Sequence, residues 1–137
     1  MEAIAKLNNC PYSPRKMRLL ADIIRGKSVD EALSILKYHP KKTYSIKLEK
    51  LILSAISNYK IKNENDRVDE ADLFIKSLFV DGARQLKRIR PAPQGRAHRI
   101  RKRSNHVTVV IDNINYINNE NSVVEKIAEN KIENSVE

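Results

Sequence analysis

Nine lysine and arginine side chains lie between residues 84 and 103, and no aspartate or glutamate lies among them. They are Arg84, Lys87, Arg88, Arg90, Arg96, Arg99, Arg101, Lys102 and Arg103. The chain of 137 residues has 26 basic and 17 acidic side chains, so its net charge of +9 belongs to this segment. Clustered cations neutralise phosphates and release condensed counterions. The segment therefore predicts binding to a nucleic acid.

The sequences that flank the basic segment predict strands. Residues 73–80 and 106–111 are rich in β-branched, aromatic and aliphatic side chains. Midway between them, residues 91–95 (PAPQG) combine two prolines, which fix φ, with a glycine, which permits positive φ. We therefore expect a long β-hairpin arm over about residues 82–106, with its turn at residues 91–95.

Cations are expected on both faces of this arm, because side chains alternate along a strand. On the outgoing limb Arg84, Arg88 and Arg90 share one parity and Lys87 has the other, and the return limb is equally mixed. A ribbon without an apolar face is marginal in water, so it should gain order from nucleic acid on either side. The alternative is a solvated or targeting charge run, which normally lies in disorder-prone sequence rather than between strands.

The rest of the chain predicts the elements that hold this arm. Residues 3–7 favour a short first strand. Ser13 and Pro14 predict the start of a helix that stops at Gly26. A capping box from Ser28 to Glu31 predicts a second helix ending before Pro40. Apolar residues at helical spacing predict a third helix over about residues 42–60. The order of one strand, three helices and two strands indicates the α+β class.

Enzymatic and membrane functions find no support in the sequence. Its glycines do not form a phosphate-binding loop, and the sequence has neither a nucleophile elbow nor a dinucleotide-binding motif. No cysteine and histidine residues are spaced as zinc ligands, so we expect no cofactor and no metal. No secretory segment or membrane span is present, which predicts a cytoplasmic protein. Cys10 is the only cysteine, and we expect it to be a small buried hydrophobe.

Several blocks keep an order and spacing that resemble a known family. They are SPRKMRL at residues 13–19, IRGK at 24–27, KRIRP at 87–91, GRA at 95–97 and KRSNHVTVV at 102–110. Over residues 1–112 they resemble the bacterial large-subunit ribosomal protein L-twenty-two. The resemblance implies a small three-stranded antiparallel sheet packed on three helices, with a long protruding basic β-hairpin. It also implies binding to large-subunit (23S-type) rRNA, help in assembly, contacts with neighbouring large-subunit proteins, and a hairpin tip in the wall of the nascent-peptide exit tunnel.

The predicted RNA-binding residues come from the arm and from the first helix. In the arm they are the nine cations together with His98 and His106; on the helix the resemblance adds Arg15, Lys16, Arg18, Arg25 and Lys27. The predicted tunnel tip consists of Pro91, Ala92, Pro93, Gln94 and Gly95. Many members of the family carry a basic residue and then alanine where this chain has Ala92 and Pro93, so its tip should be stiffer and less charged.

Two other classes of function stay open, and one segment lies outside the resemblance. A helix-turn-helix DNA-binding regulator would use the first two helices, yet the second carries mainly Lys37 as a cation. A small RNA-modifying enzyme would need a nucleophile, metal or cofactor pocket. Residues 113–137 are rich in asparagine, glutamate and serine, and this composition predicts a disordered acidic tail of unknown role.

Overall fold

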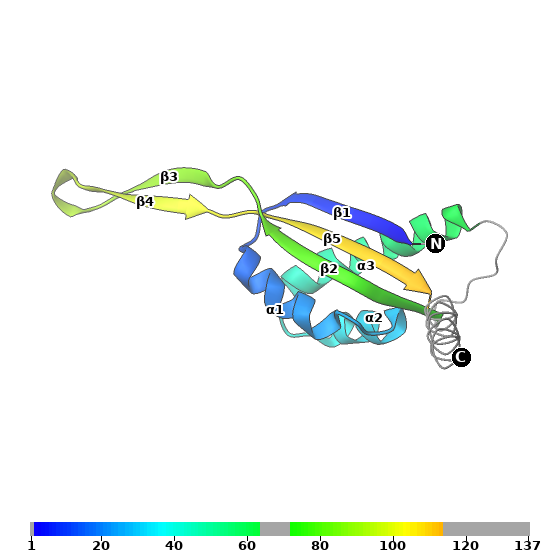
Figure 1. The fold of residues 1–137 in the computed structure, drawn as a ribbon. Helices are drawn as coiled ribbons and strands as arrows, with labels where there is room; N and C mark the ends of the chain where they lie inside the picture. Colours follow the sequence, from blue (N-terminus) through cyan, green and yellow to red (C-terminus); the bar gives the residue numbers. More distant parts are fainter. Residues whose placement is uncertain (1, 64–71, 114–137) are drawn as a thin grey trace, which may run out of the picture.

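The computed structural model describes residues 2–63 and 72–113, which form an α+β domain with a projecting arm (Figure 1). In chain order the elements are β1 (Ala3–Cys10), α1 (Pro14–Ile24), α2 (Val29–Tyr38), α3 (Lys42–Lys62), β2 (Leu73–Gly82), β3 (Leu86–Pro91), the short 3₁₀ turn η2 (Pro93–Gly95), β4 (Ala97–Lys102) and β5 (Asn105–Asn113). The predicted class is confirmed. In this part of the chain no helix is long and apolar enough to cross a membrane.

The domain has two layers, a sheet and the helices that cover one of its faces. The sheet has the order β1-β5-β2, and both pairings are antiparallel. Alternate residues of each strand, such as Ala5, Leu78 and Val109, are buried beneath the helices. Residues on the other face, such as Ile4 and Phe79, are exposed. Helix α3 packs on β1 and β5, α1 lies along β2, and α2 packs against α3.

The helices form where the sequence predicted them, with one difference in how they start. Pro14 stands in the first turn of α1, but the Ser13 side chain makes no capping hydrogen bond. Ser28 does cap α2, because its hydroxyl accepts a hydrogen bond from the Glu31 amide. Helix α3 is two residues longer than predicted, ending at Lys62. The predicted apolar stripes of the three helices lie in the core, with Leu33 only partly buried.

The outer edge of β2 is closed by the end of α1 and the turn after it. Arg18 donates a hydrogen bond from Nε to the Val80 carbonyl at 3.0 Å, and Arg25 donates from Nε and Nη2 to the Leu78 carbonyl at 3.2 and 3.0 Å. The Gly26 amide, at φ 76°, donates to the Ile75 carbonyl at 3.0 Å. Unpaired edge groups are templates for pairing with other chains. These contacts remove that hazard at β2.

Side chains of α3 cover the opposite edge of the sheet. Asn58 donates from its amide nitrogen to the Ile4 carbonyl at 3.0 Å, and Lys62 donates to the Glu2 carbonyl at 3.2 Å. Ile4 lies in β1 and Glu2 directly precedes it, so α3 reaches this edge strand through two side chains. Both edge strands of the sheet are thus contacted by α1, α3 or the turn that follows α1.

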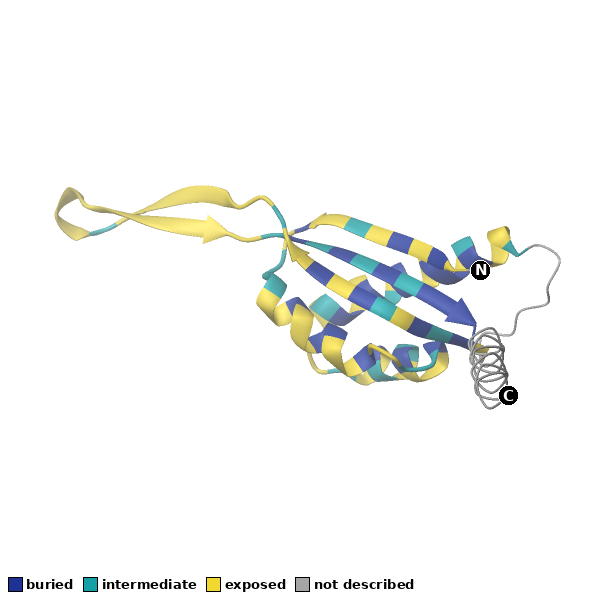
Figure 2. Ribbon diagram, in the orientation of Figure 1, coloured by how far each residue is buried: buried dark blue, intermediate teal, exposed yellow. Residues whose placement is uncertain are grey.

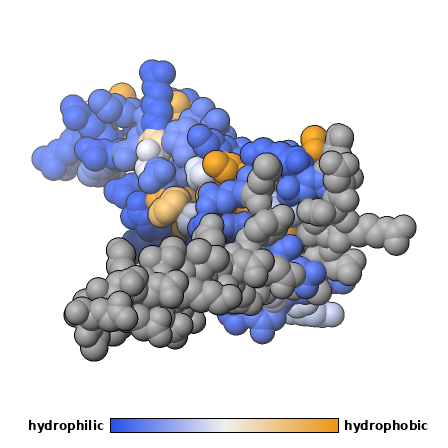
Figure 3. Space-filling model, turned by 45° about the vertical axis from the view of Figure 1, so that its right-hand side comes forward, coloured by the Kyte–Doolittle hydropathy of each residue, from blue (hydrophilic) through white to orange (hydrophobic). Residues whose placement is uncertain are grey.

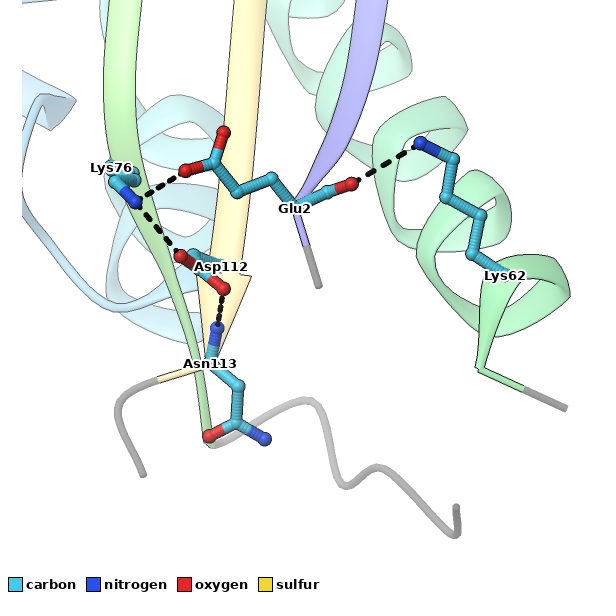
Figure 4. Close-up of polar contacts among 5 residues, drawn as sticks. All are labelled: Glu2, Lys62, Lys76, Asp112 and Asn113. Carbon is cyan, nitrogen blue, oxygen red and sulfur yellow. Dashed lines mark hydrogen bonds and ion pairs between the residues drawn. The ribbon is translucent and has the colours of Figure 1, made fainter. Parts of the chain in front are cut away.

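A charged cluster ties the three strands together at the end of the sheet that lies away from the arm (Figure 4). Lys76 stands at an irregularity of β2 between Ile75 and Ser77. It reaches both Glu2, which directly precedes β1, and Asp112 on β5, the latter at 3.1 Å. The hydrogen bond to Glu2, and to a lesser extent the one to Asp112, raises the pKa of Lys76 above its usual value. The Asp112 carboxylate also accepts a hydrogen bond from the Asn113 amide at 3.0 Å.

The predicted hairpin is interrupted where it leaves the sheet. The main sheet ends at the pair Gly82 and Asn105, and a separate two-stranded ladder begins at the pair Leu86 and Lys102. Three residues separate β2 from β3 but only two separate β4 from β5, so the outgoing limb holds one extra residue. Such an extra residue bends and twists a ribbon in the manner of a β-bulge. The parity of the side chains therefore changes at the base of the arm.

The first and last strands differ from their predicted bounds. Strand β1 continues to Cys10 past an irregularity after Leu7, with Asn9 at φ 54°. Strand β5 includes Asn113, which pairs with Leu73, so the sheet extends one residue into the segment predicted as a tail. The remainder of that predicted tail, residues 114–137, lies outside the described residues. Cys10 is buried as expected, and burial raises the pKa of its thiol despite nearby Lys47.

Candidate nucleic-acid interface

The register of the arm ladder places cations on both of its faces. Residues directly opposite each other in an antiparallel pair share a face. One face carries Leu86, Arg88, Arg90, His98, Ile100 and Lys102, and the other carries Lys87, Ile89, Pro91, Ala97, Arg99 and Arg101. Each face therefore has three permanent cations and two or three apolar side chains. The prediction that neither face is apolar is confirmed.

Every residue of β3 and β4 is exposed, as Figure 2 shows. Ile89 is 74% exposed, although it lies in the middle of β3. Lys87 and Arg101 stand directly opposite each other, and like charges in this position repel. Hydrophobic residues on the surface turned to the viewer in Figure 3 are scattered among hydrophilic ones. The arm thus makes no core of its own and carries uncompensated positive charge.

The tip of the arm is a tight turn with two residues in the left-handed region. The Ala92 amide donates to the Arg96 carbonyl at 2.8 Å, and the Arg96 amide donates to the Pro93 carbonyl at 3.4 Å. Gly95 has φ 71°, as its residue type allows, and Gln94 has φ 61° and ψ 32°. Gln94 was predicted as part of the tip but its left-handed backbone was not, because glutamine gives no signal for positive φ. No residue from 91 to 95 carries a charge, so the predicted tip is a neutral surface between cationic limbs.

Arg84 and Arg103 lie outside the ladder, in the junction between the arm and the sheet. The Ala83 amide donates to the Ser104 carbonyl at 2.9 Å, and the Ser104 hydroxyl donates to the Arg84 carbonyl. These two bonds hold the limbs together where regular pairing stops. Both arginines are exposed and continue the positive surface from the arm to the domain.

Two further residues anchor this junction to the end of β1. The Asn105 side chain is fully buried and donates to the Tyr12 carbonyl at 2.9 Å. His106, predicted as an RNA contact, accepts a hydrogen bond at Nδ1 from the Asn9 amide at 3.2 Å. That bond places the proton of a neutral imidazole on Nε2. The part of Asn105 in positioning the arm was not recognised from the sequence, since a lone asparagine in a strand has no distinctive pattern.

The predicted cations of α1 fall into three groups. Arg15 and Lys16 are exposed at the start of the helix, which lies near the base of the arm (Figure 1). Arg18 and Arg25 are engaged with the carbonyls of β2, and Arg25 also pairs with Asp22 at 2.8 Å. Lys27 follows the other end of the helix and pairs with Glu31 at 3.3 Å. The structure therefore brings only Arg15 and Lys16 to the arm as free cations.

The alternative functions gain no supporting geometry. Helix α2 carries Lys37 in its last turn, whereas the cations concentrate on the arm, so a DNA-reading second helix is not favoured. Within residues 2–63 and 72–113, no three histidine, cysteine, aspartate or glutamate side chains gather as metal ligands. The arrangement that remains is a compact domain that holds an exposed cationic ribbon.

Comparisons with known proteins agree with this arrangement. The profile of the family described as "Ribosomal protein L22p/L17e" matches residues 5–112. The chain is 64% identical over 113 residues to the "Large ribosomal subunit protein uL22" of Flavobacterium psychrophilum, covering 82% of each chain. It is 64% identical over 109 residues to the protein of that name from Christiangramia forsetii, covering 80% of each. With that from Chlorobium chlorochromatii it shares 52% over 114 residues, which is 83% of this chain and 95% of the other. The chain belongs to the ribosomal protein L22p/L17e family.

Proposed function

We propose that this chain is a structural constituent of the large ribosomal subunit, that it binds large-subunit rRNA of the 23S type, and that it assists assembly of the subunit. It works as a scaffold of the cytoplasmic ribosome and not as an enzyme. The observation that carries the proposal is the arm, whose two exposed faces bear three permanent cations each without an acidic residue. A ribbon of this kind fits between RNA helices that approach it from both sides.

The cations and the aliphatic residues of the arm have different parts in this proposal. Lysine and arginine neutralise phosphates on both sides, which supplies most of the binding free energy and fixes position rather than sequence. Ile89 and Ile100 face opposite sides of the ribbon and are 74% and 39% exposed. In the complex they pack against ribose and base surfaces. Arg15 and Lys16 extend the contact onto the domain.

The test of this proposal is co-sedimentation with ribosomal subunits. We expect the full chain to migrate stoichiometrically with the large subunit in sucrose gradients of a cell extract at moderate salt, because many phosphate contacts form together. The amounts of the protein that migrate with small subunits and with bulk DNA in the same gradient are the controls. Recovery of the protein in the soluble fraction alone, with intact large subunits elsewhere in the gradient, contradicts the proposal.

We further propose that the neutral tip at residues 91–95 forms part of the wall of the nascent-peptide exit tunnel and contacts the nascent peptide. Two prolines restrict this turn, and the hydrogen bonds between residues 92, 93 and 96 hold it closed. An uncharged and stiff surface suits a tunnel that chains of any sequence must pass. Other proteins of the large subunit adjoin both the tip and the domain.

Deleting residues 92–94 is expected to change the tunnel without preventing assembly. The limbs on either side keep all nine cations, so the contacts with rRNA persist, while the wall loses three residues. The measurements are incorporation into large subunits, tunnel density in purified ribosomes, and macrolide sensitivity of the deletion strain. Gln94→Gly is the matched control, because glycine adopts the left-handed backbone found at this position without changing loop length. Failure of assembly, or unchanged macrolide sensitivity with unchanged tunnel density, contradicts the proposed place of the tip.

A further inference from the structure

A pocket of about 510 Å³ lies at the base of the arm, beside the end of β1. Its lining consists of Asn9 and Pro11 from the region of β1, Arg84 and Leu86 from the outgoing limb, and residues 102–104 from the return limb. This volume falls in the range of pockets that hold small ligands. Because both limbs and β1 contribute, the pocket exists only where the arm meets the domain.

The walls of the pocket are held in place by hydrogen bonds of the junction. The Ser104 hydroxyl donates to the Arg84 carbonyl, and the Ser104 carbonyl accepts from the Ala83 amide at 2.9 Å. On the other side, the Asn9 amide donates to His106, and Asn9 has a left-handed backbone with φ 54°. Asparagine adopts this backbone more readily than most other residues. These bonds fix the backbone on both sides of the pocket, and the exposed side chains of Arg84, Leu86, Lys102 and Arg103 stand around it.

The lining joins an apolar surface to a cationic rim. Leu86 is 48% exposed, although it is a large aliphatic residue at the start of β3, and the exposed Pro11 lines the same pocket. Arg84, Lys102 and Arg103 surround this surface, and none of the three forms an ion pair within residues 2–63 and 72–113. A phosphate alone needs no apolar surface, and an apolar ligand needs no cations. A nucleotide needs both, since its base has apolar faces and its phosphates are anionic.

We propose that this pocket takes the base of one unpaired RNA nucleotide, turned out of its helix, while Arg84, Lys102 and Arg103 hold the adjacent phosphates. The base lies against Leu86 and Pro11, and a guanidinium plane at the rim stacks on its exposed face. The inference rests on the proposed binding of rRNA and adds to it the recognition of a single nucleotide at the point where the arm enters the RNA.

Site-specific crosslinking within assembled subunits tests where Leu86 lies. Leu86→p-benzoylphenylalanine in the full chain is expected to crosslink, on irradiation of purified large subunits, to one unpaired nucleotide that reverse transcription maps as a single stop. The same replacement at Ile89 is the matched control, because Ile89 is also an exposed aliphatic residue of β3 but does not line the pocket. Its crosslinks should fall on different nucleotides. Crosslinks from position 86 to base-paired nucleotides or to a protein overturn the inference. The proposed function would still stand in that case, because the variant protein would have been incorporated into large subunits.

Removal of the base tests the energetics of the same contact. A synthetic RNA that spans the crosslinked nucleotide is made with and without its base at that position. The full chain is expected to lose affinity about tenfold for the abasic RNA, as stacked bases typically contribute. For the Leu86→Ala protein, the drop in affinity from the intact to the abasic RNA should be clearly smaller. For the Ile89→Ala protein, that drop should be as large as for the unaltered chain. Equal losses for all three proteins overturn the inference, even if every one of them binds the intact RNA.

Discussion

Excision of residues 84–103 is expected to abolish tight rRNA binding while leaving the domain folded. An Asn-Gly dipeptide can replace the segment as a two-residue hairpin turn between Ala83 and Ser104, which are already joined by a hydrogen bond at 2.9 Å. No residue of the arm belongs to the buried core, so the free energy of unfolding should change by less than about 1 kcal/mol. The excised chain has 17 basic and 17 acidic residues and therefore no net charge.

The salt dependence of binding gives this prediction its magnitude. With the single-strand coefficient, the nine arm cations contribute roughly −6 to the slope of log affinity against log salt, and Arg15 and Lys16 bring the full chain to roughly −8. With Arg15 and Lys16 alone the slope should be roughly −1.4. Raising salt from about 50 to about 200 mM should then weaken the binding of the full chain by more than about 10⁴-fold and that of the excised chain by less than about tenfold. Filter binding to large-subunit rRNA and thermal unfolding by circular dichroism measure the two effects.

A charge-preserving variant is the matched control for the excision. Ile89→Ala combined with Ile100→Ala removes apolar area from both faces of the arm and keeps every cation, so the slope should stay near that of the full chain. Lys102→Ala combined with Arg103→Ala should reduce the magnitude of the slope of log affinity against log salt by about 1.4. An excised chain with an unchanged slope would show that the arm cations face solvent in the complex. An unfolded excised chain would show that the arm contributes to the domain.

Replacing Arg18 and Arg25 together by alanine is expected to destabilise the domain by about 2 kcal/mol. Their guanidinium groups donate to the carbonyls of Val80 and Leu78 on the outer edge of β2. Net contributions of hydrogen bonds from charged groups are about 1.5–3 kcal/mol each, and the exposure of these side chains reduces that value to about 1 kcal/mol. The opened edge should also make the protein prone to association.

Arg15→Ala combined with Lys16→Ala is the matched control on the same helix. These side chains are exposed and have no partner among the described residues, so their loss should change the free energy of unfolding by less than about 0.5 kcal/mol. The slope of rRNA binding should instead fall by about 1.4. Urea denaturation and filter binding of both double variants separate the two effects. Equal stability of the two variants would refute the edge-closing function of Arg18 and Arg25.

The arm, its turn and its charge could be predicted from the sequence for local physical reasons. Strand-forming flanks, prolines and a glycine midway, and alternation of side chains are properties of consecutive residues. Charge needs no fold to be counted, so the nucleic-acid function followed from composition, and the motif blocks added the family. Helix positions were predicted equally well, because apolar spacing and stop signals lie within each segment.

Only the tertiary structure decided which cations are free and how the arm is attached. Arg15 and Arg18 lie three residues apart in one helix and both are exposed, yet only Arg18 donates a hydrogen bond to the Val80 carbonyl. That difference depends on where α1 packs against β2, which is a contact between residues far apart in the chain. The extra residue at the base of the arm, the bond from Asn105 to Tyr12 and the pocket beside Leu86 arise in the same way. Local sequence patterns determined the elements and their charge, whereas long-range packing determined which groups remain available to RNA.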